Sequence, residues 1–173
     1  DMDWLPVSTS RRRQFITIGQ LIDRKGINLV IDRFAQFCRL PEAEGYTLLI
    51  AGRGPSEEAL KLQAKQLGLE GRILFLGFLS HRQLGHHLSE SVATLVATHQ
   101  DLNMVSITES VACGTPVITS TVPNTSLWIS RHHLGIVDDN WGAEHMLAVA
   151  TDDSYMRCCL DERPHLSCEA AAQ

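Results

Sequence analysis

The sequence predicts an α/β fold in which one doubly wound, Rossmann-like parallel sheet carries helices on both faces. Three observations predict it. Apolar segments of strand length alternate with segments of helical periodicity from residue 14 to residue 150. The strand segments are continuous apolar runs, which is typical of a sheet buried on both faces. The connections are short, so right-handed crossovers between parallel strands are expected.

Six apolar segments are the predicted strands. They span residues 15–18, 46–51, 73–76, 92–98, 117–119 and 134–137. In a sheet of this class, ligands bind outside the carboxyl ends of the strands. The first four of these ends carry Gly19, Gly52, Gly77 and Thr98. We therefore expect a site where these four positions meet.

Helices are predicted between the strands. Apolar residues recur with helical spacing after Gly26. Glu57 and Glu58 open the next helix, where the helix dipole favours acidic residues. Ser80 and Gln83 have the spacing of a capping box at the start of a third helix. Further helical segments are expected at 109–113, 126–129 and 143–150.

The periodic pattern sets the predicted domain boundaries. Residues 1–13 are interpreted as a lead-in or linker, and their run Arg11-Arg12-Arg13 as solvated. Residues 14–150 form the predicted domain, without an internal linker. Residues 151–173 lose the pattern and are predicted to be an irregular C-terminal tail.

Composition narrows the function classes. The formal net charge of −5 excludes a general nucleic-acid binder, so an anionic ligand needs a local positive site such as 11–13 or 24–25. No apolar run approaches the roughly 18 residues of a membrane span, and the acidic first residues do not resemble a secretory signal. Five cysteines without a C-x-x-C pair favour a reducing, cytoplasmic compartment. Most of the eight histidines are interpreted as solvated or capping, and no metal site is predicted.

Two acidic residues follow the fourth predicted strand. Asp101 comes directly after it, and Glu109 is separated from Asp101 by seven residues. The first turn of the intervening helix, at residues 103–106, offers free N–H groups and a positive dipole end to an anion. Carboxylates are compatible with such an anion when they face sugar or ribose hydroxyls. The spacing alone favours the alternative that Asp101 is a loop or capping residue and Glu109 a solvated helix residue.

The context of these acids resembles a known signature. The run Glu-Ser-Val-Ala-Cys-Gly-Thr-Pro-Val-Ile at 109–118, with an acid seven residues before it, is similar to that of family-four glycosyltransferases, which are retaining enzymes with the two-domain GT-B fold. Upstream segments resemble, in the same order, the family's phosphate segment, its Gly-x-Gly-Pro turn and its base-contacting strand end; they lie at 18–26, 49–55 and 75–78. The resemblance covers about residues 15–150 and implies one half of a GT-B fold.

The resemblance also implies roles for individual residues. Lys25 is expected to contact the donor diphosphate and Glu109 the ribose hydroxyls. Asp101 is the candidate catalytic residue, with an orienting and electrostatic role toward the transferred sugar. The other candidate donor-binding residues are Gly19, Gln20, Gly52, Arg53, Phe78, Leu79, Asn103, Met104 and Val105.

Four departures from the family pattern affect catalysis more than binding. Gln20 stands where the family has arginine, and a neutral hydrogen bond is roughly half as strong as a charge-assisted one. Asp101 replaces a glutamate, and Met104 replaces a glycine, so that its side chain is expected to crowd the diphosphate. The downstream Gly-Gly-x-Pro-Glu is replaced by residues 121–125.

The predicted function is therefore donor binding for a retaining hexosyltransferase of polysaccharide biosynthesis. The donor is a UDP-, GDP- or ADP-sugar, the acceptor is a glycan or a lipid-linked molecule, and neither a metal nor another cofactor is expected. Turnover is expected to require an N-terminal acceptor-binding domain or subunit, which could also provide peripheral membrane association. Two alternatives stay open: a non-catalytic nucleotide-binding or interaction subunit of a split or degenerate enzyme, and a sugar-nucleotide epimerase on the same fold. Whether the chain is itself an enzyme stays open with them.

Overall fold

The computed structural model describes residues 5–169, with side chains through residue 166. The outer ends of the predicted lead-in and tail, residues 1–4 and 170–173, lie outside the described residues. Six strands form one parallel sheet in the order β3-β2-β1-β4-β5-β6. They are β1 (Gln14–Ile18), β2 (Thr47–Ala51), β3 (Ile73–Gly77), β4 (Ala93–Leu95), β5 (Val117–Thr119) and β6 (Gly135–Val137). This arrangement confirms the predicted fold class.

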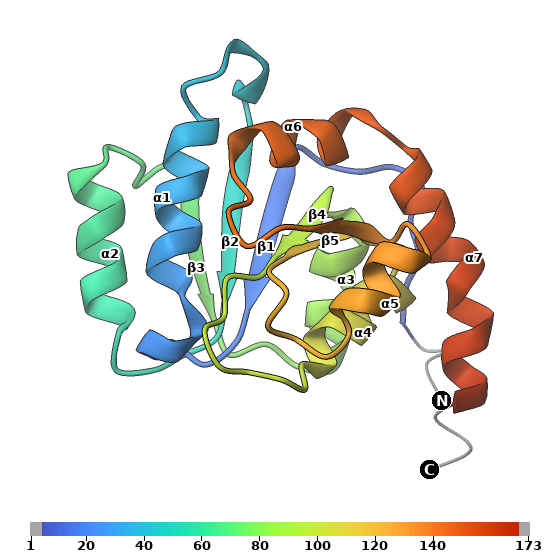
Figure 1. Cartoon of the computed structure of the whole chain (residues 1–173). Coiled ribbons are helices and arrows are strands. Elements are labelled where there is room, and N and C mark those ends of the chain that lie inside the picture. Colours follow the sequence, from blue (N-terminus) through green and yellow to red (C-terminus); the bar gives the residue numbers. More distant parts are fainter. Residues whose placement is uncertain (1–4, 170–173) are drawn as a thin grey trace.

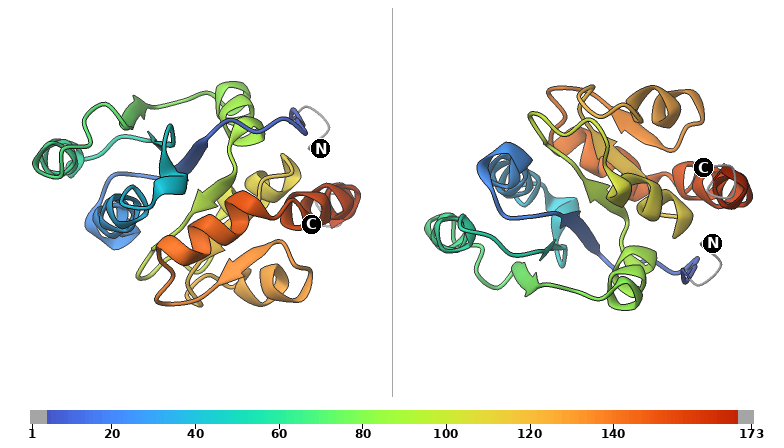
Figure 2. Two further views of the ribbon diagram at one scale, coloured as in Figure 1. Left: turned by 90° about the horizontal axis from the view of Figure 1, so that it is seen from above. Right: turned by 90° about the horizontal axis from the view of Figure 1, so that it is seen from below.

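Helices cover both faces of the sheet (Figures 1 and 2). The main helices are α1 (Ile27–Phe37), α2 (Glu57–Gln66), α3 (His81–Glu90), α4 (Val105–Ala112), α5 (Ser126–Arg131), α6 (Ala143–Thr151) and α7 (Ser154–Glu169). Two short 3-10 helices are η1 (Asp23–Lys25) and η2 (Pro41–Ala43). Within residues 5–169, none of these helices has both the length and the apolar character that crossing a membrane requires.

Two separate apolar cores explain why the sheet is buried on both sides. One core packs α1, α2 and α6 against one face, and the other packs α3, α4, α5 and α7 against the opposite face. In the first core, the ring of Phe15 from β1 meets that of Phe37 edge-on at 5.2 Å and stacks on Tyr46 at 5.5 Å. Since β1 and β4 occupy the centre of the sheet, the loops that follow them are held by both cores.

Local signals set the helix starts. The capping box of α3 is present: the Ser80 hydroxyl accepts from the N–H of Gln83, and the Gln83 side chain accepts from the N–H of Ser80.

The strand β4 is shorter than the predicted 92–98. Its chain nevertheless continues in a buried path, since the N–H of Val96 donates to Ile118 and its carbonyl accepts from the Trp141 indole. The loop after β4 therefore starts from a fixed point.

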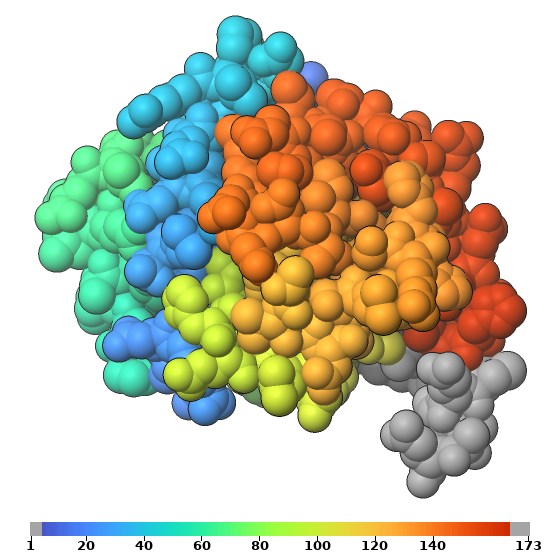
Figure 3. All heavy atoms as spheres, viewed as in Figure 1, coloured from blue at the N-terminus to red at the C-terminus, as the bar shows by residue number. Residues whose placement is uncertain are grey.

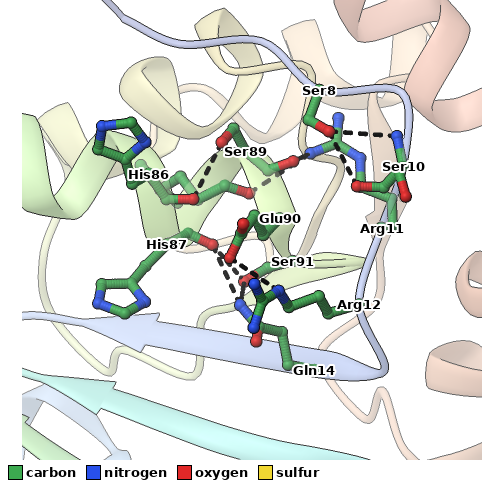
Figure 4. A network of polar contacts seen from close by, with 11 residues as sticks. Ser8, Ser10, Arg11, Arg12, Gln14, His86, His87, Ser89, Glu90 and Ser91 are labelled. Atoms are coloured by element: carbon green, nitrogen blue, oxygen red, sulfur yellow. Dashed lines mark hydrogen bonds and ion pairs between the residues drawn. The ribbon is translucent and has the colours of Figure 1, made fainter.

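The lead-in differs from its prediction as a solvated segment. The Arg11 guanidinium is inserted where α3 and α4 end. It donates to the carbonyl of Ser89 (Figure 4), to the carbonyl of Gly114 and to the Thr115 hydroxyl. Burial lowers the pKa of Arg11, yet the negative ends of two helix dipoles favour a cation there. The interpretation of a fully solvated triple arginine is therefore wrong for Arg11. It fits Arg12, which is exposed and pairs with Glu90 at 3.1 Å.

The predicted irregular tail after residue 150 is also wrong. It was expected to be irregular, but α7 fills residues 154–169 and packs against α4. Cys159 and Leu166 are buried, Glu162 accepts from the Trp128 indole at 2.9 Å, and Arg163 donates to the Ala112 carbonyl at 2.8 Å. The helix is hard to recognise in the sequence because its apolar residues do not gather on one helical face and Pro164 lies inside it. Its docking depends on contacts with distant residues.

Candidate functional site

The strand order places a topological switch point between β1 and β4. The chain leaves β1 toward α1 on one face of the sheet and leaves β4 toward α4 on the other. In open α/β sheets, ligands bind in the crevice expected at such a point, outside the carboxyl ends of the strands. The segments 19–26 and 98–104 border this crevice.

The two loops at the switch point are fastened to each other. Gly26 has a φ of 64°, and a Cβ at this residue would lie 2.0 Å from the Ala97 carbonyl oxygen. Only glycine therefore lets η1 approach the end of β4 so closely. The Arg24 carbonyl then accepts from the backbone N–H of His99 at 2.9 Å and lies 3.1 Å from the Thr98 hydroxyl.

Asp101 is held at the centre of this junction. Its Oδ2 lies 2.6 Å from the Thr98 hydroxyl and 3.1 Å from Nζ of Lys25, and its Oδ1 lies 3.6 Å from Nε of Arg24. Burial alone raises the pKa of the Asp101 carboxyl, but the Thr98 hydrogen bond and Lys25 together lower it below its ordinary 3.8. Asp101 is therefore a carboxylate at neutral pH, and one oxygen of it already faces Lys25.

A cleft of about 770 Å³ adjoins the crevice at the carboxyl ends of β1, β2 and β3. Its lining residues are Ile18, Gly19, Gln20, Ala51, Gly52, Arg53, Phe78, Leu79, Ser80, His81 and Leu84. Gly52 has a φ of 141°, and a Cβ there would lie 1.9 Å from the Gly19 carbonyl oxygen, so these two loops also require glycine. The Phe78 side chain is 79% exposed, and the Arg53 guanidinium lies against Gly77.

The start of α4 differs in one respect from expectation. Met104, the N-cap residue, is only 8% exposed and belongs to the core between the sheet and the α4 face. Its side chain packs into the protein rather than standing in the crevice, so the expected crowding of a diphosphate is wrong. Val105 is 69% exposed, and Asn103 accepts from the Asn124 amide at 3.1 Å.

Glu109 lies one helical turn further along α4. Its side chain is 12% exposed, and its Oε1 lies 3.3 Å from Nδ1 of His81. His81 also lines the cleft, so the Glu109 carboxylate stands next to the cleft wall. The interpretation of Glu109 as a solvated helix residue is thereby excluded.

The predicted site residues fall into three neighbouring groups. Six line the cleft, and Lys25 and Asp101 form an ion pair in the crevice. The remaining four lie immediately before α4 or on it. The first two groups are contiguous, because a Cβ at Gly19 would lie 3.4 Å from Cδ of Lys25.

Sequence reasoning missed two residues of the site. His81 sits at the first position after the capping Ser80, and that position carried no chemical signal of its own. Arg24 was noted only as a local positive charge beside Lys25. Among the described residues, no three His, Cys, Asp or Glu side chains come together as metal ligands would.

Comparisons with known proteins agree with this geometry. Residues 6–147 match the family described as glycosyl transferases group 1. The lipopolysaccharide core biosynthesis glycosyltransferase LpsE of Rhizobium meliloti is 28% identical over 153 residues, which cover 87% of this chain and 43% of that protein. The alpha-monoglucosyldiacylglycerol synthase of Streptococcus pneumoniae is 27% identical over 138 residues, covering 80% of this chain and 30% of that protein.

Solved structures show the same fold. Sucrose-phosphate synthase from Thermosynechococcus elongatus superposes with a TM-score of 0.80 at 20% identity, covering 97% of this chain and 46% of that one. Anabaena HepE, solved in complex with UDP-glucose, superposes with a TM-score of 0.78 at 18% identity, covering 96% of this chain and 50% of that one. The chain thus spans half or less of the length of each of these proteins, and its fold corresponds to the C-terminal half of GT-B structures.

Proposed function

The chain belongs to the family of glycosyl transferases group 1, and from this premise we propose that it binds the nucleoside-diphosphate sugar of a retaining hexosyltransferase at the carboxyl ends of its strands. One observation carries the proposal. The Lys25 side chain in the crevice lies directly against Gly19, which is part of the cleft wall. A cationic pocket and a largely apolar cleft are therefore continuous. This combination suits a ligand with a charged diphosphate at one end and a flat nucleoside at the other.

The donor would lie across the switch point. Its diphosphate would meet Lys25 and the first-turn N–H groups of α4, which carry the positive end of the helix dipole. Its ribose would reach Glu109, and its base would enter the cleft beside Phe78 and Leu79. Since Asp101 pairs with Lys25 in this structure, donor binding would redistribute the Lys25 hydrogen bonds between Asp101 and the phosphates.

Catalysis would require an acceptor-binding domain or subunit in addition to this chain. We propose that Asp101 orients the transferred sugar and stabilises charge near it. An N-terminal domain or subunit would bring a glycan or lipid-linked acceptor, as the names of the relatives from R. meliloti and S. pneumoniae suggest for those proteins. Basic groups and a helix N-terminus would stabilise the leaving diphosphate without a metal. Free thiols at Cys38, Cys113, Cys158 and Cys159 support a cytoplasmic location.

A second candidate function is a non-catalytic nucleotide-binding or interaction subunit of a split or degenerate enzyme. Gln20 favours it, because the diphosphate site lacks the charge that this position supplies in the family. The engagement of Lys25 by Asp101 favours it as well. Both candidates share nucleotide binding and differ in whether an acceptor is glycosylated when the other half is present.

Isothermal titration calorimetry of the 173-residue chain with UDP, GDP and ADP, and with their glucose conjugates, tests the shared part. We expect saturable binding of at least one nucleotide, weakened about tenfold by Lys25→Ala or Glu109→Gln, as for loss of a charge-assisted hydrogen bond. Lys65→Ala on α2 and Glu70→Gln before β3 are matched controls, because both residues are exposed and lie away from the crevice.

Two outcomes would contradict the proposal. One is the absence of binding by all three nucleotides at millimolar concentration. The other is equal loss of affinity in the site variants and their controls. Glycosyl transfer by the chain without any second part would contradict the requirement for an acceptor domain.

A further inference from the structure

Gln20 leaves the proposed diphosphate site one positive charge short. It is exposed and lines the cleft beside Gly19, but its amide can only donate a neutral hydrogen bond. On the neighbouring turn of the same loop stands a cation that none of the expected roles uses, Arg24. Its surroundings indicate how the missing charge is replaced.

The backbone of Arg24 is anchored by hydrogen bonds, whereas its side chain is half exposed. Its carbonyl is held by the N–H of His99 and lies 3.1 Å from the Thr98 hydroxyl, so η1 is anchored to the end of β4. The side chain is 52% exposed and rests with Nε 3.6 Å from Oδ1 of Asp101. This is a long, single contact rather than the bidentate pairing that a guanidinium makes with a carboxylate at close range. Most of the N–H donors of the Arg24 guanidinium are therefore available to another anion.

The charges in the junction do not balance. Asp101 contributes one negative charge, because its pKa lies below the ordinary value, while Arg24 and Lys25 each contribute one positive charge. These three side chains together therefore carry a net positive charge at neutral pH. Asp23, which lines the hollow next to Arg24, accepts a hydrogen bond from the Ser56 hydroxyl at 3.2 Å instead of pairing with either cation. Asp101 lies three residues before Met104, the N-cap residue of α4, and the N-terminus of a helix carries the positive end of its dipole.

There is room for a ligand beside Arg24. A hollow of about 480 Å³ is lined by Asp23, Arg24, Asn28, His99 and Gln100. In Figure 3 the yellow-green segment after β4 and the blue segment before α1 lie side by side at the surface, so this junction is open to solvent.

We propose that Arg24 is a second cationic contact of the donor diphosphate and replaces the charge that Gln20 lacks. Arg24 would present its planar donors to the phosphate oxygens while Lys25 contacts them as a point charge. Asp101 lies between the two cations and would hold both near the crevice before the donor arrives. This inference rests on the proposed function, and it assigns the site a specific requirement for a phosphorylated ligand.

The test is titration of the full chain with UDP, GDP and ADP and with the unphosphorylated nucleosides uridine, guanosine and adenosine. Arg24→Ala is expected to weaken diphosphate binding about tenfold and to leave nucleoside binding unchanged. Arg24→Lys is expected to lose less affinity for the diphosphates than Arg24→Ala does. Gln20→Arg in the Arg24→Ala background is expected to restore affinity, because it returns the charge to the position that the family uses. Arg39→Ala is the matched control, since Arg39 is exposed and follows the opposite end of α1.

The outcomes separate this inference from the proposed function. One outcome is that wild type binds a diphosphate with an affinity that Lys25→Ala weakens and Arg24→Ala changes by less than twofold. In that case the proposed role of Arg24 is wrong, while the proposed donor site is still supported. If Arg24→Ala weakens nucleoside and diphosphate alike, or Gln20→Arg does not rescue it, the role is also wrong. If wild type binds no nucleotide, both proposals fall. Thermal unfolding of each variant identifies any loss due to misfolding.

Discussion

The two edges of the sheet use the same residue types in opposite ways. At the amino edge, where the strands begin, Arg11 is partly buried, and its guanidinium donates to carbonyls at the ends of α3 and α4. Figure 4 shows its contact with Ser89 at the end of α3. At the carboxyl edge, where the strands end, Arg24 is half exposed and makes one long contact to Asp101. The first arginine completes the fold, and the second is available to a ligand.

The difference extends beyond arginine. At the carboxyl edge, glycines let loops approach one another closely, and Phe78 and Val105 expose large apolar side chains. Arg24 and Phe78 at this edge therefore keep exposed donors or exposed apolar surface, whereas the Arg11 guanidinium at the amino edge donates to carbonyls of the fold. A binding site in this fold is thus marked by side chains whose hydrogen-bond donors or apolar surface the fold itself does not use. Four predictions test that contrast.

The largest expected effect is at the amino edge. Arg11→Ala should lower the free energy of unfolding by about 3 kcal/mol, because several buried carbonyls lose their donor at once. Urea denaturation monitored by circular dichroism measures it. The adjacent Arg12→Ala, which removes a surface ion pair with Glu90, should change stability by no more than about 1 kcal/mol. Equal effects of the two variants would contradict the assignment of Arg11 to the fold.

The next effect is at the carboxyl edge and arises from backbone crowding. Gly52→Ala should cost about 2 kcal/mol, because a Cβ there meets the Gly19 carbonyl oxygen at 1.9 Å and the φ of 141° disfavours a side chain. The matched control is Gly71→Ala, since nothing lies within 4 Å of a Cβ at Gly71. A Gly52 variant as stable as the Gly71 variant would show that the two loops are not in close contact.

Asp101→Asn should have a smaller effect that depends on pH. The pKa of Asp101 is depressed in the folded state, so its ionised form stabilises the fold above its ordinary value of 3.8, and this contribution is lost as the pH falls through the folded-state pKa. Wild type should exceed the variant by about 1 kcal/mol at neutral pH. The gap should close between about pH 5 and about pH 2. Denaturation at several pH values measures it, and a constant gap would contradict the pairing; in a Lys25→Met background the gap should shrink.

The smallest expected effect on stability is that of Phe78→Ala. Because this side chain is 79% exposed, the unfolding free energy should change by no more than about 0.5 kcal/mol, while nucleotide affinity falls. Phe34→Ala, at a fully buried ring of similar size, should cost about 3–5 kcal/mol. A large stability loss at Phe78 would mean that this ring serves the fold rather than the cleft.

Much of this arrangement could be predicted from local patterns. Strand and helix periodicities depend on neighbouring residues, so the six strands and the capping box at Ser80 were found, and the strand ends identified Gly19 and Gly52 as cleft residues. The docking of α7 could not be found in the same way. Its buried residues are few, and its stability comes from α4 and α5 rather than from its own periodicity.

By itself, the sequence determined the order of elements, the parallel class of the sheet and which residues stand at its carboxyl ends, because these follow from apolar periodicity and turn chemistry. Only the tertiary structure decided which of those ends meet. The order β3-β2-β1-β4-β5-β6 brings Asp101 to Arg24 and Lys25. It also places Arg11 among backbone carbonyls and leaves Arg24 half exposed. The reason is physical: burial and pairing of a charge depend on residues far away in the chain, which no local pattern of the sequence contains.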